Sequence, residues 1–250
     1  MKVCTLASGS SGNSLFIQTE YSKILIDAGI SLRQIKTRLK RLDVELSDLD
    51  AVIISHEHLD HAMSIPQIEN PAYVASTTMH LWKDKVKNLF EFDTGSSFSI
   101  KDALITSFSV PHDAVDPVGF TIETDHRKLG IVTDIGTATS LVKERLKGSH
   151  ILIIEFNHDE NILRESHYPW EIKQRIMSRL GHLSNEQAAD LFASLLHNEL
   201  YHLLLAHLSE TNNRYDIALK AASSVIGKTG ADHIRPSIAP RKNLGEVLTI

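Results

Sequence analysis

Short apolar runs separated by Gly, Ser and Asn dominate the beginning of the chain. Val3 to Ala7, Ser14 to Thr19 and Lys23 to Asp27 consist largely of aliphatic and β-branched residues and are bounded by turn-forming residues. Runs of this length with such boundaries are typical of β-strands. The pattern therefore predicts a meander of three strands at the start of the fold.

The hydrophobic spacing then changes to that of a helix. Apolar residues recur at intervals of three and four positions from Leu32 to Leu42, which predicts an amphipathic helix. Its other side is basic and carries Arg33, Lys36, Lys40 and Arg41. We interpret this side as a solvated charged face, with contact to phosphate groups as the alternative.

The rest of the chain alternates between apolar runs and helical patterns. Strands are predicted, in chain order, at 50–55, 108–112, 118–123, 128–133 and 150–155. Helices are predicted at 138–147, 169–179, 185–196 and 213–226. The strands fall into two groups, from Val3 to about Thr124 and from Lys128 onward. Two sheets flanked by helices are the simplest arrangement for this order of elements.

Composition and charge narrow the class of protein. The 250 residues contain no internal repeat and no linker of distinct composition, so we expect one soluble globular domain over residues 1–250. Cys4 is the only cysteine and therefore excludes an internal disulfide. No apolar run approaches the roughly 18 to 20 residues of a membrane span, and we expect a cytoplasmic protein. The net charge of −5 argues against coating of nucleic acid through bulk charge, although local basic patches remain possible.

Histidine is the unusual component, with 14 residues in the chain, and imidazole is the commonest side-chain metal ligand. The sequence His56-Glu57-His58-Leu59-Asp60-His61 follows the predicted strand at 50–55 directly. In a loop that leaves a strand, His56 and His58 can share one cation, and Asp60 and His61 can serve a second. Nitrogen and oxygen donors of this kind suit zinc, with manganese or iron as alternatives.

A site with two cations needs further ligands at strand ends, where a rigid scaffold can present them. His112, Asp134 and His207 each end an apolar run. Alone, each would be read as an ordinary hydrogen-bonded residue. Together they supply the missing donors, with His112 on the first metal, His207 on the second and Asp134 bridging. The sequence thus predicts two divalent cations, zinc first and manganese as the alternative.

These motifs resemble those of the metallo-β-lactamase superfamily. HEHLDH followed by separate His, Asp and His residues at strand ends is its ligand pattern, and the likeness spans essentially the whole chain. The segments LASGSSGNS, LIDAGIS, NHD followed by YPWEIK, GHLSNEQAA and LAHLSETNN are similar to the YycJ-type branch. The resemblance implies an αββα four-layer sandwich and a DNA exonuclease of 5'-to-3' polarity that acts on DNA ends.

Departures from neighbouring branches exclude other activities of the superfamily. True β-lactamases generally use a cysteine ligand, and Cys4 lies outside every ligand segment. The interval from His112 to Asp134 is too short for the tRNA-gripping arm of many tRNase Z enzymes. The interval from Asp134 to His207 leaves no room for the large inserted domain of the RNase J and cleavage-factor nucleases. Antibiotics, tRNA precursors and long structured RNA are therefore not the expected substrates.

A second resemblance, to tRNase Z, concerns Glu155 and His182. Glu155 ends the predicted strand at 150–155, and His182 precedes Ser184, which opens a Ser-x-x-Gln capping box with Gln187. In tRNase Z a Glu orients a His that protonates the leaving oxygen. Two alternatives stay open: His182 is only a helix-entry residue, or His182 rather than His207 completes the second metal site. We favour His207 because His-x-Ser after an apolar strand matches the last ligand motif of the family.

Three further residues are candidates for substrate contact. Ser10 and Asn13 lie in the loop Ser8 to Ser14, whose hydroxyl and N–H groups can line a phosphate, while a tight hairpin turn explains the same residues. His158 follows Asn157 and is expected to contact phosphate or to support Glu155, with a surface-loop residue as the alternative.

The hypothesis for the mechanism is that two cations hold a bridging hydroxide, which Asp60 orients for in-line attack on phosphorus. His182, held by Glu155, would then protonate the leaving oxygen. One alternative, hydrolysis of a small phosphodiester, a cyclic nucleotide or a thioester, uses the same ligands. A non-catalytic binding or regulatory module is the alternative of another class. The oligomeric state is left open.

Overall fold

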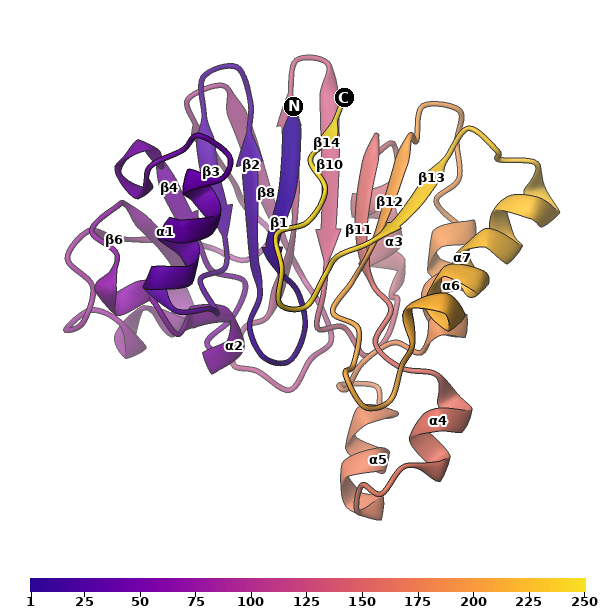
Figure 1. Ribbon diagram of the computed structural model, residues 1–250. Helices are drawn as coiled ribbons and strands as arrows, with labels where there is room; N and C mark the ends of the chain where they lie inside the picture. Colours follow the sequence, from indigo (N-terminus) through magenta and orange to yellow (C-terminus); the bar gives the residue numbers. More distant parts are fainter.

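Two mixed β-sheets packed face to face form the centre of the structure, a computed structural model that describes residues 1–250 (Figure 1). The first sheet has the spatial order β14 (Leu248–Thr249), β1 (Lys2–Ala7), β2 (Ser14–Gln18), β3 (Lys23–Ile26), β4 (Ala51–Ile53), β5 (Ala72–Ala75) and β6 (Leu89–Phe92). The second has the order β13 (Arg235–Ile238), β12 (His202–Ala206), β11 (Ile151–Glu155), β10 (Arg127–Val132), β9 (Val118–Thr124), β8 (Ala103–Ser109) and β7 (Ser97–Ile100).

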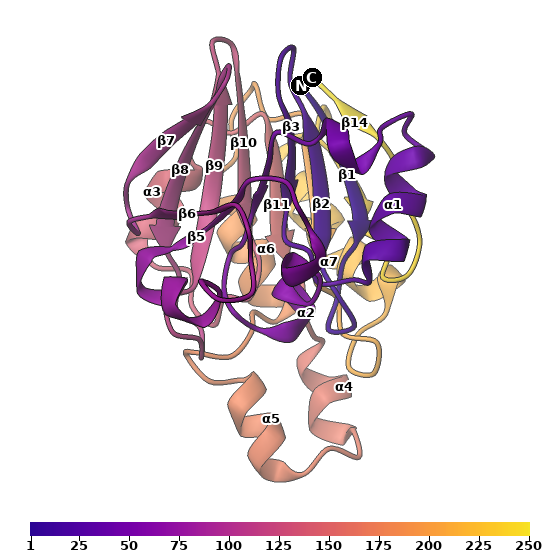
Figure 2. The same ribbon diagram turned by 90° about the vertical axis from the view of Figure 1, so that its left-hand side faces the viewer.

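The helices are α1 (Leu32–Lys40), α2 (Leu59–Ala62), α3 (Ser140–Leu146), α4 (Glu160–Glu165), α5 (Trp170–Ile176), α6 (Asn185–Ala193) and α7 (Tyr215–Thr229). The helix α1 covers the outer face of the first sheet and α3, α6 and α7 that of the second, whereas α4 and α5 extend beyond the sheet edge (Figures 1 and 2). Short 3-10 turns occur at Leu46–Asp48, Ile65–Gln67 and Ser76–Leu81. The helix α1 begins at Ser31, whose capping box with Gln34 satisfies free N–H groups of the first turn. The predicted capping box of Ser184 and Gln187 likewise opens α6.

Three apolar clusters hold the layers together. The central cluster joins the inner faces of the sheets and contains Ile24, Ile53, Phe120 and Ile153. A second cluster packs α3, α6 and α7 against the second sheet, and a third packs α1 against the first. Burial of apolar surface on both faces of each sheet is the main stabilising term in such a layered fold. The predicted αββα sandwich is thereby confirmed.

The predicted grouping of the strands is wrong. The chain leaves the first sheet between β6 and β7, not near Thr124, and β14 returns to the first sheet at the end of the chain. The turn at Asp125 and His126 is only the hairpin that joins β9 to β10 within the second sheet. A turn inside a sheet and a turn between sheets have the same local sequence signals, so the boundary could not be placed from pattern alone.

Several element boundaries also differ from the predicted ones. The strand expected at 108–112 is β8, which ends at Ser109, so His112 lies in the loop beyond Pro111. The predicted helix at 213–226 is α7, which runs three residues further. The strands β5, β6, β7, β13 and β14 and the helices α2 and α4 were not predicted. They are two to six residues long, and so short a segment carries almost no periodic signal.

Parallel pairing determines where the functional side chains lie. The strands β3 to β6 pair in parallel, as do β10 to β13. The carboxyl ends of parallel strands lie at the same edge of a sheet, where open α/β sheets bind their ligands. No helix in this structure combines the length and the apolar character that crossing a bilayer requires.

The residues directly after β11 are buried and pair with the residues at the start of α6. His158 forms a backbone bridge with Ser184, and its carbonyl oxygen accepts from the N–H of Asn185. The His158 side chain is only 1% exposed, and its Nδ1 atom has no hydrogen-bond partner. Burial lowers the pKa of His158 to about 4, because desolvation disfavours the charged imidazolium.

The buried His158 predicts a loss of stability in acid. His158 takes up a proton near pH 6.5 in the unfolded chain but only near pH 4 in the folded chain. The free energy of unfolding is therefore highest above pH 6.5, as far as His158 is concerned, and decreases as the pH falls below that value. The loss is about 2 kcal/mol by about pH 5. Denaturant unfolding of the wild type and of His158→Gln at several pH values measures it, because both proteins share every other titrating group. Parallel curves of stability against pH would contradict the assignment.

Candidate metal centre

Side chains from five strand ends meet at one edge of the sandwich. They follow β3, β4, β10, β11 and β12 and include Asp27, His56, Asp134, Glu155 and His207. Asp27, Asp134 and His207 have positive φ angles of 61°, 53° and 53°. A left-handed backbone costs a non-glycine residue of order 1–3 kcal/mol and is often found at functional sites. The fold therefore accepts strain at the same positions that aim these side chains.

The first cluster of donors consists of His56, His58 and His112, as the sequence predicted. One nitrogen from each of the three lies within 4.8 Å of the others. His56 follows β4, His58 precedes α2, and His112 comes from the loop after β8. The His112 ring is oriented by contact of its Nδ1 with the carbonyl oxygen of Gly181 at 3.2 Å. Three imidazoles converging on one point form a set of zinc-type ligands.

The second cluster consists of Asp60, His61 and His207, whose donor atoms also lie within 4.8 Å of one another. Asp134 lies between the clusters. Its carboxylate is 3.0 Å from His61 Nε2, 3.6 Å from His207 Nε2 and 3.8 Å from His112 Nε2. This is the position that a bridging ligand requires.

The donor atoms of this centre fit a bound cation. His56 Nε2 and His207 Nε2 are buried and have no hydrogen-bond partner, and Asp134 Oδ2 has only its contact with His61 Nε2 at 3.0 Å. An unpartnered buried polar atom costs about 1–3 kcal/mol, and two at one point are rare in a folded protein. Coordination of a divalent cation would satisfy all of them, because neutral imidazole and carboxylate are preferred ligands of zinc.

The charge balance of the site also calls for a cation. Burial alone would raise the pKa of Asp134, but His207 and His61 hold it well below the ordinary value. Burial would lower the pKa of His207, but Asp134, Asp60 and Glu155 raise it to about 10. In the metal-free protein, protonated imidazoles therefore balance the buried carboxylates, and cations would replace those protons on binding.

Asp27 is a functional residue that the sequence analysis missed. Its Oδ2 atom lies 2.7 Å from His61 Nδ1, and its two oxygens accept from the N–H and hydroxyl of Ser55. The contact turns His61 Nε2 toward Asp134. A carboxylate on the far nitrogen of a ligating histidine fixes its tautomer and strengthens the ligand. The only sequence signal was a polar residue at the end of a buried strand.

Glu155 contacts two histidines through one oxygen. Its Oε1 atom lies 2.8 Å from Nδ1 of His182 and 2.8 Å from Nδ1 of His207, and its Oε2 accepts from the N–H of Ile135. Burial would raise the pKa of Glu155, but the two histidines lower it to about 2. The predicted contact with His182 is present, while the contact with His207 was not foreseen.

The two histidines differ in their surroundings. The His207 side chain is 3% exposed and its free Nε2 faces Asp60 and Asp134. The His182 side chain is 20% exposed and lies beside the ring of His112, with a centroid distance of 5.2 Å. His207 thus offers a buried nitrogen without a partner, whereas His182 is more exposed but also lies near Asp134, with Nδ1 3.8 Å from its carboxylate. The assignment of His207 to the second metal stays a prediction.

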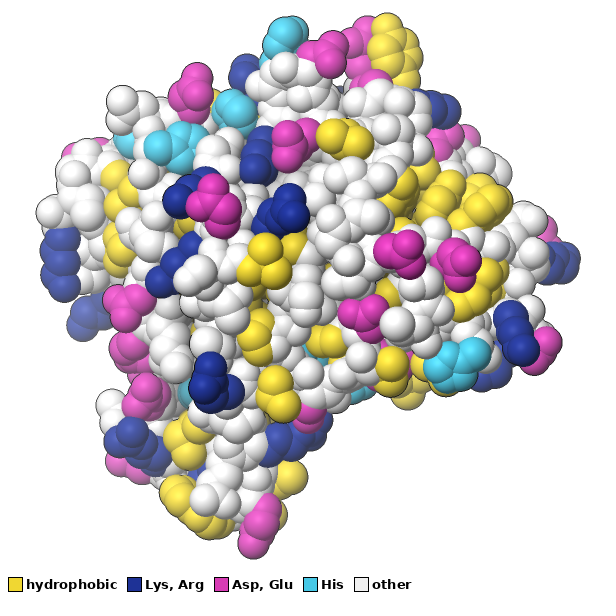
Figure 3. All heavy atoms as spheres, turned by 180° about the vertical axis from the view of Figure 1, so that it is seen from behind, with side chains coloured by type: hydrophobic (Ala, Val, Ile, Leu, Met, Phe, Trp, Pro, Cys, Tyr) yellow, Lys and Arg dark blue, Asp and Glu magenta, His cyan; other side chains and the backbone are white.

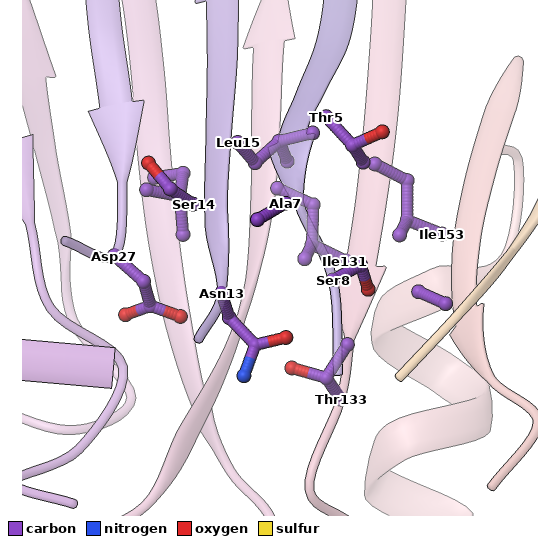
Figure 4. Close-up of a pocket in the computed structure, with 12 residues that line it drawn as sticks. Thr5, Ala7, Ser8, Asn13, Ser14, Leu15, Asp27, Ile131, Thr133 and Ile153 are labelled. Atoms are coloured by element: carbon purple, nitrogen blue, oxygen red, sulfur yellow. The ribbon is translucent and has the colours of Figure 1, made fainter. Parts of the chain in front are cut away.

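The loop between β1 and β2 contacts the candidate metal centre at His61. Asn13 is buried, its Oδ1 accepts from the N–H of Gly9, and its Nδ2 lies 2.9 Å from His61 Nε2. Figure 4 shows Asn13 between Asp27 and Thr133 at a cavity of about 30 Å³ between the sheets. This volume is enough for about one water molecule. The site thus borders a small cavity that polar and aliphatic side chains line together.

Glycine is required where α2 meets its neighbours. A Cβ atom on Gly29 would overlap the carbonyl of Asp60, so only glycine allows this approach to the ligand segment.

The three candidates for substrate contact lie in different surroundings. Ser10 is exposed on the β1–β2 loop, whereas Asn13 and His158 are buried. The alternative that His158 is a surface-loop residue does not hold. Substrate contact by these residues stays a prediction.

A helical arm projects beside the site. The helices α4 and α5 extend beyond the sheet edge in both views (Figures 1 and 2). Arg175 of α5 donates to Asp113 at 2.6 Å, and Asp113 also lies 3.3 Å from Nε2 of His112. This ion pair joins the arm to the loop that carries a candidate ligand.

Known proteins resemble this chain over most of its length. Residues 22–203 match the family model described as "Beta-lactamase superfamily domain". Exodeoxyribonuclease YycJ of Bacillus anthracis is 34% identical over 234 residues, which cover 90% of this chain and 89% of the relative. Exodeoxyribonuclease WalJ of Streptococcus pneumoniae is 36% identical over 228 residues, which cover 87% and 85%.

Solved structures share the fold. The metallo-β-lactamase fold protein YhfI of Bacillus subtilis has a TM-score of 0.77 at 18% identity and covers 99% of both chains. The short form of human tRNase Z has a TM-score of 0.67 at 15% identity and covers 100% of both. The prediction of a metal-dependent hydrolase is confirmed by the family and its curated relatives. The chain belongs to the β-lactamase superfamily, in the branch that contains YycJ and WalJ.

Proposed function

We propose that this protein is a phosphodiesterase with two divalent cations that removes nucleotides from DNA ends in the 5'-to-3' direction. The observation that carries the proposal is the pair of donor clusters on either side of Asp134, with His182 at their mouth. The relatives YycJ and WalJ are named exodeoxyribonucleases, which supports DNA as the substrate. The polarity rests on the resemblance to the YycJ-type branch.

The cations would be held by His56, His58 and His112 on one side and by Asp60, His61 and His207 on the other, with Asp134 between them. Zinc suits this set best, and manganese is the alternative. When bound, they supply Lewis-acid stabilisation of the negative charge that develops on a phosphoryl group.

The other groups of the site orient the reactants and move protons. The Asp60 side chain is 28% exposed and can accept a hydrogen bond from the attacking water. Because Glu155 occupies Nδ1 of His182, Nε2 of His182 is directed away from Glu155 and can donate a proton to the leaving oxygen. Burial would lower the pKa of His182, but Glu155 outweighs it and raises this pKa. The contact with Glu155 thereby favours the imidazolium form that a general acid needs.

The direct test uses the purified protein with zinc or manganese on DNA and RNA labelled at either end. We expect stepwise release from the 5' end of DNA and none by Asp134→Asn. Hydrolysis of bis-p-nitrophenyl phosphate without any cleavage of DNA would instead favour a small phosphodiester as substrate. Bound metal without any hydrolysis would indicate a non-catalytic module.

The His182→Ala substitution separates the general acid from the metal ligands. We expect turnover to fall by roughly 10²- to 10⁴-fold, the usual loss for a general acid, with metal content unchanged. Emission spectroscopy for metal and single-turnover kinetics measure the two quantities. His126→Ala, an exposed histidine on the β9–β10 turn, is the control. Loss of one metal equivalent in His182→Ala would mean that His182 is a ligand.

The Asp27→Asn substitution tests the support of His61. We expect metal affinity to fall about 10- to 100-fold, because His61 loses the charged acceptor on Nδ1. Competition of the protein with a chromophoric zinc chelator measures this change. Asp48→Asn is a matched control, because Asp48 is half-exposed and pairs with Lys23 at the opposite end of β3. Equal affinities of the two variants would disprove the supporting role of Asp27.

A further inference from the structure

A basic groove lies outside the metal centre, between α1 and the segment that precedes β14. Its volume is about 540 Å³. Arg33, Arg38, Arg41 and Lys242 line it, and no carboxylate does. Figure 2 shows this segment beside α1. Four basic side chains with no acidic side chain in the same lining are unusual in a chain whose net charge is −5.

The groove is held in shape by a buried arginine. Arg38 is 9% exposed and donates from Nη1 to the carbonyl of Leu6 at 2.7 Å and from Nη2 to the carbonyl of Lys242 at 2.6 Å. It therefore fixes the distance between α1 and the opposite wall. Burial, and then the charge of Arg41, lower the pKa of Arg38. The groove thus keeps like charges close together at a free-energy cost, which an anion would offset.

The basic side chains of the groove differ in how available they are to an anion. Lys242 pairs with Glu210 at 2.8 Å, so its charge is partly neutralised. Arg33 and Arg41 are exposed and take part in no ion pair. A guanidinium group in this state binds phosphate oxygens through two parallel hydrogen bonds.

The groove adjoins the metal centre through the chain that follows His207. Arg241, next to Lys242, donates to the carbonyls of Leu208 and Ser209 at 3.0 and 2.6 Å. A Cβ atom on Gly9 would lie 3.5 Å from Arg241 Cγ. The neighbouring Ser8 accepts from the N–H of His207 at 2.8 Å. These contacts connect the wall of the groove with the β1–β2 loop and with the segment that carries His207.

Two other surfaces have mixed charges. The hollow on the other side of α1 places Lys36 near Glu45 and Glu69. The face opposite to that of Figure 1 shows Lys and Arg interspersed with Asp and Glu (Figure 3). A second hollow with basic side chains, lined by Arg127 and Arg235, lies at the amino ends of β10 and β13, at the edge opposite to the metal centre. The groove beside α1 is therefore the basic hollow on the side of the β1–β2 loop.

From these observations we infer that the groove binds the phosphate backbone of a nucleic-acid strand several nucleotides away from the end that is hydrolysed. The inference rests on the proposed function and adds to it a second contact surface. Backbone contacts position a strand without reading its sequence. Single strands are bound in basic grooves of this kind.

The test compares the metal-loaded wild type with Arg33→Glu/Arg41→Glu on two substrates. One is a single-stranded DNA of about 20 nucleotides, and the other is bis-p-nitrophenyl phosphate, which is too small to reach the groove. Loss of two phosphate contacts should lower the dependence of log kcat/KM on log salt concentration by about 1.4 and weaken kcat/KM for DNA about 25-fold at ~0.1 M salt. Hydrolysis of the small diester should not change.

The matched control is Lys220→Glu/Lys228→Glu, which makes the same change of charge at exposed positions of α7. If this variant loses activity on DNA as strongly, general electrostatics and not the groove is responsible. The inference is also overturned if Arg33→Glu/Arg41→Glu retains full activity on DNA, or if both substrates suffer equally. The milder Arg33→Gln/Arg41→Gln loses the same two contacts without adding negative charge and should show a loss no larger than that of the Glu variant. A wild type that cleaves the small diester but no DNA would overturn the proposed function itself.

Discussion

The structure depends on a carboxylate that water cannot reach. Asp134 is 3% exposed, and a buried charge of this kind is tolerated only with compensating partners. His61 and His207 provide them, each held from behind by a second carboxylate, Asp27 or Glu155. Acids and imidazoles therefore alternate through the site. A cation bound at the middle of this arrangement would neutralise the charge of the carboxylates.

The scaffold reaches this arrangement through parallel strands that end at one edge. Most of these residues lie just beyond the end of a strand, where the backbone is free to turn, and Glu155 is the last residue of β11. Three of these residues accept a left-handed conformation. Apolar packing between the layers must provide the free energy that this conformation costs. The strained residues of the site therefore depend on the apolar packing between the layers.

Much of the centre could be predicted because ligands have a chemical signature. His56, His58 and His61 lie within one short segment, and His112, Asp134 and His207 each follow an apolar run. Asp27 and the second contact of Glu155 could not be predicted, since hydrogen bonding to a ligand requires only a carboxylate at the right distance. The strand order was also beyond the sequence, because pairing between β1 and β14 joins the two ends of the chain. The αββα order of the layers was expected from the resemblance to the metallo-β-lactamase superfamily, because hydrophobic periodicity alone does not give it.

The shared oxygen of Glu155 ties two properties of the protein together. His182 and His207 draw on the same negative charge at equal distance. If His182 delivers the proton and His207 binds a cation, as proposed, a substitution of Glu155 would therefore alter proton delivery and cation binding together.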